Sequence, residues 1–225
     1  MTLDILWRAV LVVAAAYLVG GIPFGVIFGR HLHGVDIQTM GSGATGATNV
    51  YRNLGWKTAL AVGLLDIAKG AVAVGVARFV APAGWSQNGA DLLAIAAGVA
   101  AMAGHVYSPF LRFRGGKGIS VAAGGIVVLM PWVALVLIVV FAGAVLALRI
   151  VSVASMLAAL VFPVAILVLY PERPLLVLFA VLALPLVLWA HRANIRRLQR
   201  GEEPRITIGR GSGPAEEHTD REDRR

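Results

Sequence analysis

The chain alternates long apolar runs with short polar segments. Runs near the roughly 20 apolar residues that cross a bilayer are read as helices. They cover about residues 6–28, 58–80, 91–107, 119–130, 131–148, 153–169 and 175–190. The pattern therefore predicts an all-α integral membrane protein, a bundle of about seven transmembrane helices, some of them short.

Two prolines set helix boundaries in this interpretation. The apolar run 119–148 is long for one straight span, so we divide it at Pro131 into two helices, the first one short. Pro23 is expected to loosen the last turn of the first helix, and Arg30 to mark its exit into a polar loop. Five spans remain the alternative, if 119–148 is a single helix and another segment is discarded.

Composition excludes a water-soluble domain. Of the 225 residues, 58% are hydrophobic and only 14% are charged, whereas soluble domains carry about a quarter charged residues. The absence of cysteine excludes disulfides and thiolate metal sites. The net charge of +8 lies in short basic blocks between apolar runs, so we expect no nucleic-acid partner.

The basic residues also predict the orientation. With seven spans, one face collects nearly all of them, and the positive-inside rule places that face in the cytoplasm, with the N-terminus outside and the C-terminus inside. The basic positions on this face are Arg30, Arg52, Lys57, Arg112, Arg114, Lys117, Arg149 and the cluster 192–200. Residues 1–206 then form a single transmembrane domain with Gly-rich loops on the cytoplasmic side, and 207–225 a disordered, charged tail.

The first polar cluster runs from Gly41 to Gly55. Its fifteen positions contain four glycines together with hydroxyl and amide side chains. Successive backbone N–H groups in such a segment form a concave site for an anion. Arg52 adds a guanidinium that can hold a phosphate through two hydrogen bonds. The segment is a candidate phosphate-binding loop; the alternative is an interhelical loop that is Gly-rich because it turns tightly.

Two further clusters lie on the same face. Residues 113–118 combine a Gly-rich anion site with Lys117, but they are not a Walker A loop, since Leu111 and Gly118 stand where that motif needs Gly and Ser or Thr. Residues 191–198 predict a helix that continues out of the last span, with His191 and Asn194 on one side, suited to polyol hydroxyls. The alternative there is a basic anchor with an interfacial histidine.

Ionisable residues elsewhere give weaker signals. Asp66 and Lys69 share a face of the second span, as a functional pair or a structural ion pair. His31 and Asp36 have the His-x-x-x-x-Asp spacing of another class of acyltransferases, but that class's downstream motifs are missing, so we interpret it as coincidence. His31 and His33 lack further ligands at suitable spacing, and no metal site is predicted.

Taken in order, these motifs resemble the bacterial acyl-phosphate:glycerol-3-phosphate acyltransferases, the PlsY family. The resemblance covers about residues 20–206 and rests on Gly-Ser-Gly-x-x-Gly-Ala-Thr-Asn-x-x-Arg-x-x-Gly from Gly41, Asp66-x-x-Lys69-Gly70, Gly104-His105, 113–118, Arg149-x-x-Ser152, and 191–204. The chain departs from the family pattern at Ala44, commonly Asn, at Arg114, usually Lys, and at 119–121. Position 44 is therefore not nominated as a site residue.

The resemblance implies a membrane acyltransferase of phospholipid synthesis. It would move a fatty acyl group from acyl phosphate to the 1-hydroxyl of glycerol 3-phosphate, giving lysophosphatidic acid and phosphate, without a cofactor. Its active site would face the cytoplasm from the bacterial inner (plasma) membrane, among membrane lipid. The implied catalytic residues are Ser42, Arg52, Lys117, His191 and Asn194. The implied substrate- or phosphate-binding residues are Gly41, Gly43, Gly46, Thr48, Asn49, Lys69, Arg114, Gly115, Gly116, Gly118 and Ser152.

The sequence leaves two questions of chemistry open. No Ser-His-Asp or His-Asp set is evident, so the proton of the acceptor hydroxyl passes either to an oxygen of acyl phosphate or to His191 as general base. A small anion transporter is the second function class, with broken helices around a phosphate path. No inverted repeat supports that class, and the polar clusters fall on one membrane face rather than at the midplane.

Overall fold

The structure, a computed structural model, describes residues 3–82 and 84–206. The tail that the sequence predicts to be disordered, 207–225, lies outside these residues. Every regular element of the described chain is helical, which confirms the all-α prediction. The α-helices are α1 Leu3–Gly21, α2 Phe24–His33, α3 Ala47–Leu54, α4 Trp56–Val80, α5 Gln87–Val106, α6 Ile119–Leu129, α7 Pro131–Leu148, α8 Val151–Leu169, α9 Pro174–Ala190 and α10 Arg192–Gln199, with short 3-10 turns at Ile37–Thr39 and Pro109–Leu111.

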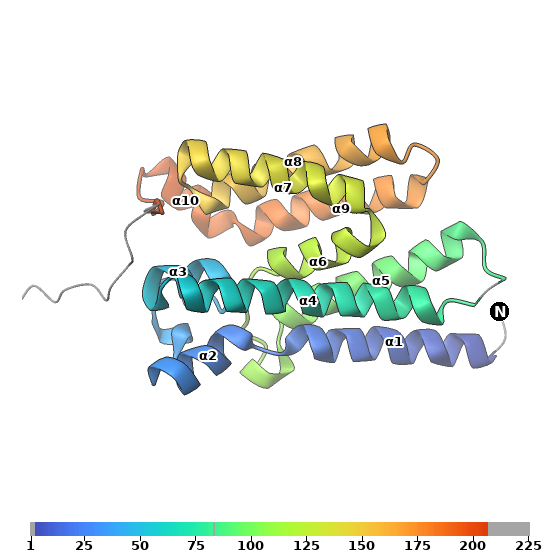
Figure 1. Ribbon diagram of the computed structural model, residues 1–225, viewed down its shortest axis with the longest axis horizontal. Coiled ribbons are helices and arrows are strands. Elements are labelled where there is room, and N and C mark those ends of the chain that lie inside the picture. Colours follow the sequence, from blue (N-terminus) through green and yellow to red (C-terminus); the bar gives the residue numbers. More distant parts are fainter. Residues whose placement is uncertain (1–2, 83, 207–225) are drawn as a thin grey trace, which may run out of the picture.

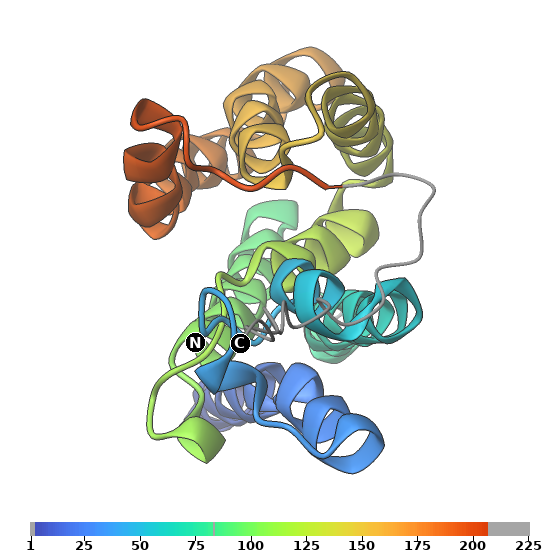
Figure 2. The ribbon, with the colours of Figure 1, turned by 90° about the vertical axis from the view of Figure 1, so that its left-hand side faces the viewer.

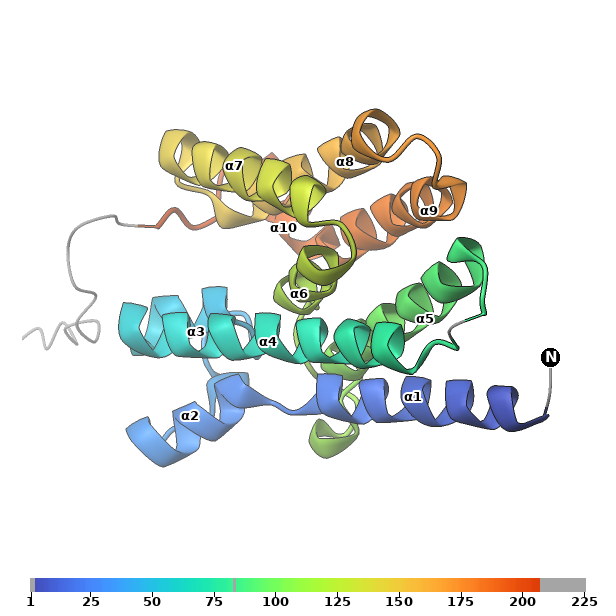
Figure 3. The same ribbon diagram turned by 45° about the vertical axis from the view of Figure 1, so that its right-hand side comes forward.

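The long helices form two groups that α6 connects (Figure 1). Helices α1, α4 and α5 make one group, and α7, α8 and α9 make the other. Helix α6 lies between them, and Figure 3 shows it reaching from α4 and α5 toward the second group. The largest apolar core joins the two groups through Val74 on α4, Met130 beside α6, and Ile166 and Leu176 on α8 and α9.

Glycines allow close approach of the helix backbones. A Cβ at Gly70 on α4 would collide with the Val121 carbonyl of α6, and one at Gly124 on α6 would collide with the Ile67 carbonyl of α4. Helices α1 and α5 touch in the same way through Gly20 and Gly104. Small residues at helix contacts are the usual packing device in membranes, because close contact replaces the missing hydrophobic drive. This packing fixes α6 and the loop before it against α4.

The polar segments gather at one end of the bundle, which we call the polar end (Figure 1). It carries α3 and the loop before it, the α7–α8 junction, α10 and residues 201–206. The opposite end carries the first residues of α1 and the connections α4–α5 and α8–α9. Seen from the polar end, residues 201–206 run from α10 along the α7–α8 junction, between the two groups of helices (Figure 2). The predicted convergence of the polar clusters on one face is therefore present.

A count of seven complete membrane crossings stays a prediction. Five helical segments are long and apolar enough to cross by length and composition, or six when the bent pair α9 and α10 counts as one. Helix α6 has only 11 residues, about 16 Å at 1.5 Å per residue, against about 30 Å of hydrocarbon. It therefore cannot cross alone, although its direction keeps α5 and α7 running the same way along the bundle.

Prolines act differently at different positions. Pro131 begins α7, as expected, because the first turn of a helix needs no N–H from that residue. The first helix is interrupted at Ile22 and Pro23 and resumes as α2. Helix α2 ends at His33, with Gly34 as its C-cap, so the expected exit at Arg30 was about one turn too early. Pro163 and Pro185 lie inside α8 and α9 without ending them.

Candidate functional site

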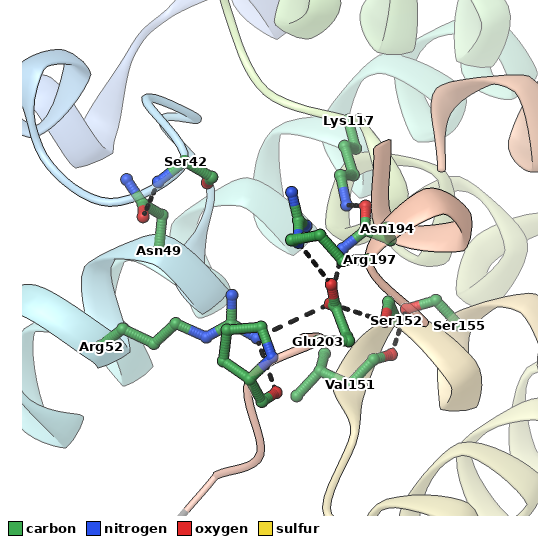
Figure 4. A network of polar contacts seen from close by, with 11 residues as sticks. Ser42, Asn49, Arg52, Lys117, Val151, Ser152, Ser155, Asn194, Arg197 and Glu203 are labelled. Carbon is green, nitrogen blue, oxygen red and sulfur yellow. Dashed lines mark hydrogen bonds and ion pairs between the residues drawn. The ribbon is translucent and has the colours of Figure 1, made fainter. Parts of the chain in front are cut away.

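The carboxylate of Glu203 is the centre of a polar cluster at the polar end (Figure 4). Its Oε1 accepts hydrogen bonds from Ser152 Oγ at 2.8 Å and Asn194 Nδ2 at 2.7 Å, and its Oε2 accepts one from Arg197 Nε at 2.7 Å. Arg52 Nη2 lies 3.9 Å from Oε1 and donates to the Pro204 carbonyl at 3.2 Å. Residues from α3, α8 and α10 thus converge on one buried anion.

Lys117 enters the cluster from the α5–α6 loop. Its Nζ donates to Asn194 Oδ1, and Asn194 in turn donates to Glu203. Asn194 is buried on α10 and oriented by both contacts, so its amide links a cation to a carboxylate. Lys117 and Asn194, which lie 77 positions apart in the sequence, are thus in direct contact.

The cluster has more positive than negative charge. Arg52, Lys117 and Arg197 face the single carboxylate of Glu203. Burial alone would raise the pKa of Glu203, but hydrogen bonds from Asn194, Arg197 and Ser152 outweigh it and hold that pKa below its usual value. Burial lowers the pKa of Lys117 to about 8. Such a site attracts a further anion, because two cationic charges remain uncompensated.

Burial also shapes Arg52. Loss of hydration lowers the pKa of Arg52, while the nearby Glu203 carboxylate raises it, and a guanidinium stays charged throughout the physiological range. Its Nε is enclosed without a hydrogen-bond partner in the described chain. A buried donor left unpaired is costly, so this nitrogen favours an anionic ligand that the protein alone does not supply.

Asn49 holds the first Gly-rich loop together. Its Oδ1 accepts from the Ser42 N–H at 3.1 Å, and its Nδ2 lies within 3.3 Å of the carbonyls of Ile37, Met40 and Ala44. Because the amide is buried and occupied by the loop itself, Asn49 shapes the loop and is not placed to bind substrate. The hydroxyl of Ser42, in contrast, has no partner in the part of the chain described.

The other residues nominated in this segment have backbone roles. Gly41 and Gly43 adopt φ values of +54° and +69°, which favour glycine. Gly46 precedes the first residue of α3, and Thr48 lies in its first turn, partly exposed. The loop therefore exposes Ser42 and delivers Arg52 from the last turn of α3.

The second Gly-rich loop corrects one expectation. The N–H groups of Gly115 and Gly116 donate to the carbonyls of Val106 and His105 at 3.0 and 3.1 Å, so they cap α5 and are not free to form an anion site. Gly118, with φ +76°, precedes α6 and turns the chain into it. The loop presents the Lys117 side chain, and Gln38 Nε2 ties it to the first loop through the Arg114 carbonyl at 2.9 Å.

His191 lies at a bend rather than in a continuing helix. The predicted helix does follow the last span, as α10, but α9 and α10 meet at 58°. The ring is 2% exposed, and Nδ1 lies 2.8 Å from the Val187 carbonyl. A carbonyl only accepts, hence Nδ1 carries the proton and Nε2 the lone pair. The interfacial anchor considered for this histidine does not fit its burial.

Comparison with known proteins gives the family. The family model described as glycerol-3-phosphate acyltransferase matches residues 10–201. The chain belongs to the glycerol-3-phosphate acyltransferase (PlsY) family. A curated glycerol-3-phosphate acyltransferase of Chlorobium phaeobacteroides (strain DSM 266 / SMG 266 / 2430) is 41% identical, with 89% of this chain and 97% of that protein covered. One of Synechococcus sp. (strain CC9902) is also 41% identical over 89% and 96%.

A solved structure supports the same assignment. The crystal structure of PlsY, an integral membrane glycerol 3-phosphate acyltransferase, in its glycerol 3-phosphate form, superposes with a TM-score of 0.80 at 35% identity, covering 89% of this chain and 96% of that one. A second form, with lysophosphatidic acid, gives a TM-score of 0.76 at 36% identity. The chain is thus a multi-pass membrane acyltransferase, which confirms the predicted fold class and the suspected family.

Two nominated basic residues of this acyltransferase lie outside the Glu203 cluster. Lys69 Nζ contacts Asp66 Oδ1, the Ile22 carbonyl and His105 Nδ1, each at 2.9 Å, inside the first helix group. Of the two readings of Asp66 and Lys69, the ion pair is present. The side chain of Arg114 is exposed, and its backbone N–H and carbonyl are hydrogen-bonded to the Leu111 carbonyl and to Gln38 Nε2.

Asp36 and His33 each have a partner other than His31. Asp36 pairs with Arg30 at 2.7 Å instead of His31, and hydrogen bonds from Arg30 and the Gln38 N–H hold the pKa of Asp36 below its usual value. His33 contacts Thr58 Oγ1 at 2.9 Å. Across residues 3–82 and 84–206, no three His, Cys, Asp or Glu side chains are grouped closely enough to hold a metal ion.

Sequence reasoning missed Glu203 and Arg197 as site residues. Both stand in the final motif of the family resemblance. The available signal was an acidic residue followed by proline directly after the basic helix. The hydrogen bonds to Ser152 and Asn194 reveal its place.

Proposed function

We propose that this acyltransferase moves a fatty acyl group from acyl phosphate to the 1-hydroxyl of glycerol 3-phosphate, releasing lysophosphatidic acid and inorganic phosphate. The polar end faces the cytoplasm from the bacterial plasma membrane, with the N-terminus outside and the C-terminus inside. Basic residues dominate the polar end, in keeping with the positive-inside rule. No cofactor takes part.

The convergence of donors on Glu203 is the observation that carries this proposal. Arg52, Lys117, Ser152 and Asn194 come from four separate segments, yet all approach one carboxylate or its immediate partner. Carboxylate and phosphate oxygens accept the same hydrogen bonds from guanidinium, ammonium and amide groups. A cluster that already holds one anion with cationic charge in excess suits a phosphate group beside it.

The reaction needs orientation and charge stabilisation. The glycerol 3-phosphate hydroxyl oxygen bonds to the acyl carbonyl carbon, the bond from that carbon to the phosphate oxygen breaks, and phosphate leaves with the electron pair. Lys117 and Arg52 stabilise the negative charge on the phosphates, and Asn194 and Ser152 orient them through hydrogen bonds. Holding both substrates in contact lowers the barrier further, because the step becomes effectively intramolecular.

The proton of the acceptor hydroxyl has two alternative acceptors. In one route an oxygen of the departing phosphate takes it; in the other His191 Nε2 does, since Nδ1 already donates to Val187. Replacing His191 by Gln and measuring turnover at saturating substrates separates them. Near-wild-type kcat with a raised KM supports the phosphate route and a binding role for His191, whereas a kcat loss of about a hundredfold or more supports the base.

The donor and acceptor are tested together with purified protein in detergent. Phosphate release is followed with acyl phosphate alone and with acyl phosphate plus glycerol 3-phosphate. Formation of lysophosphatidic acid is measured in the second mixture and in one with acyl-CoA in place of acyl phosphate. Release that requires both acyl phosphate and glycerol 3-phosphate, with no lysophosphatidic acid from acyl-CoA, supports the proposal. Equal product from acyl-CoA contradicts the donor, and no reaction in folded protein contradicts the function.

A further inference from the structure

A second polar cluster lies behind the Lys117 loop, inside the first helix group. Asp66 and Lys69 on α4 and His105 at the end of α5 are 1%, 4% and 6% exposed. Lys69 Nζ lies 2.9 Å from each of Asp66 Oδ1, the Ile22 carbonyl and His105 Nδ1. Lys69 hydrogen-bonds to the Ile22 carbonyl and to His105 Nδ1, and its contact with Asp66 is an ion pair.

These contacts fix the protonation of the His105 ring. Because Lys69 donates to Nδ1, that nitrogen carries the lone pair, and the proton of the neutral ring is on Nε2. The ammonium beside Nδ1 opposes a second proton there, and Asp66 balances the Lys69 charge. His105 Nε2–H is thus a neutral hydrogen-bond donor in a fixed orientation.

The donor nitrogen lies against the second Gly-rich loop. A Cβ built on Gly116 would overlap His105 Nε2, and one on Gly115 would collide with the His105 carbonyl. In the described chain Nε2 has no hydrogen-bond partner, and the fully enclosed polar side-chain atoms without one are Arg52 Nε and Asp66 Oδ1. The Nε2–H is therefore an unpaired donor that lies against the loop that delivers Lys117.

We propose that His105 is a further substrate-binding residue, whose Nε2–H donates to a phosphate oxygen at the 115–118 loop. Asp66 and Lys69 are positioning residues that hold the ring in the tautomer this requires. The inference rests on the proposed function, since it needs a phosphate-bearing substrate at this loop. It also gives the loop a donor in place of the Gly115 and Gly116 N–H groups, which are occupied by α5 carbonyls.

The test compares His105→Leu, which removes the donor, with His105→Gln, whose amide retains one. His31→Leu is the matched control, because His31 is exposed on α2. We expect His105→Leu to raise the KM for glycerol 3-phosphate or for acyl phosphate on the order of tenfold, with kcat changed less, and His105→Gln to recover most of it. Unchanged KM values for both substrates in folded His105→Leu would overturn the proposal.

A measurement on the wild-type protein covers the case in which His105→Leu does not fold. Histidine labelled with ¹⁵N is assigned with His105→Gln, and glycerol 3-phosphate and inorganic phosphate are titrated in turn. A shift of the His105 Nε2 resonance at saturation supports the proposal, and an unshifted resonance while glycerol 3-phosphate binds refutes it. Absence of any binding or turnover by wild type refutes the proposed function instead.

Discussion

The protein surrounds one buried carboxylate with cations at each end of the bundle, and the two clusters differ in how completely their donors are satisfied. At the opposite end, Asp91 is 0% exposed and accepts from Arg78 at 3.2 Å, from Gln87 at 3.0 Å and from Arg173, whose Nε lies at 2.9 Å. These contacts tie α4 and α5 to the residue before α9. The guanidinium of Arg173 reaches Asp91 through two of its nitrogens.

In the Glu203 cluster the hydrogen-bond donors are less completely satisfied. Arg52 approaches the carboxylate only to 3.9 Å and has an enclosed Nε without a partner in the described chain. Neutral donors, Ser152 and Asn194, take part beside the cations, and Lys117 arrives on a Gly-rich loop rather than a helix. The two cations at Asp91 exceed that carboxylate by one charge, whereas the three at Glu203 exceed theirs by two, so the Glu203 cluster is the better site for a further anion.

The largest expected effect is the loss of activity when the Glu203 cluster loses a cation. Lys117→Ala and Arg52→Ala should each lower kcat/KM by about a hundredfold or more, because each removes a charged donor from a desolvated site. The thermal unfolding midpoint should change little. Steady-state phosphate release with both substrates measures kcat/KM. A kcat/KM within threefold of wild type for either variant would contradict the functional role of the Glu203 cluster.

A substitution in the Asp91 cluster should affect stability and leave activity unchanged. Asp91→Ala leaves the Arg173 guanidinium without its partner and should lower the free energy of unfolding by about 3 kcal/mol. The folded fraction should keep its kcat. Unfolding in detergent, followed by helical circular dichroism, measures the first effect, and Glu172→Ala, an exposed neighbour, is the control. A kcat loss in fully folded Asp91→Ala would show that the opposite end takes part in catalysis.

A smaller effect is expected from the backbone of the second loop. Gly116→Ala places a Cβ against the His105 ring and should displace the Lys117 loop, raising the KM of a phosphate substrate roughly tenfold. Gly75→Ala on α4 is the matched control, since its Cβ meets nothing within 4 Å. Kinetics at varied concentrations of each substrate measure the change, and equal KM values for the two variants would contradict it.

The last prediction concerns the pH dependence of activity, an effect that is absent near neutral pH and begins near pH 8. Because burial lowers the pKa of Lys117 to about 8, the free enzyme loses this positive charge as pH rises through that value. The kcat/KM for the phosphate substrates should then fall about tenfold per pH unit above pH 8. In Lys117→Arg, whatever its absolute activity, the decline should disappear up to about pH 10, since a guanidinium remains protonated. An identical decline in that variant would assign the ionisation to another group.

The sequence predicts the helices well and the contacts between them poorly. Apolar run length and Pro131 locate the long helices, because these features act locally. Pro163 and Pro185 lie within helices, since neighbouring helices in a membrane satisfy the freed carbonyls. The bend at His191 depends on tertiary packing, and no local signal marks it.

The same division holds for the site. Arg52, Lys117 and Asn194 were identifiable because basic and amide residues in Gly-rich or basic segments stand out from an apolar chain. The separate role of Asn49, which closes the first loop, was not, since loop-shaping and ligand-binding amides look alike in sequence. Lys69 was nominated as a substrate-binding residue for the same reason. In the structure its Nζ makes three contacts within the protein instead.

The most direct test of the central claim is a crystal structure with bound glycerol 3-phosphate. The account predicts that its phosphate lies within hydrogen-bond distance of Arg52 or Lys117, with the glycerol hydroxyls toward Asn194 and His191. A phosphate bound at Arg78 and Arg173 near Asp91, or anywhere that leaves both Arg52 and Lys117 without a contact to it, would contradict the account.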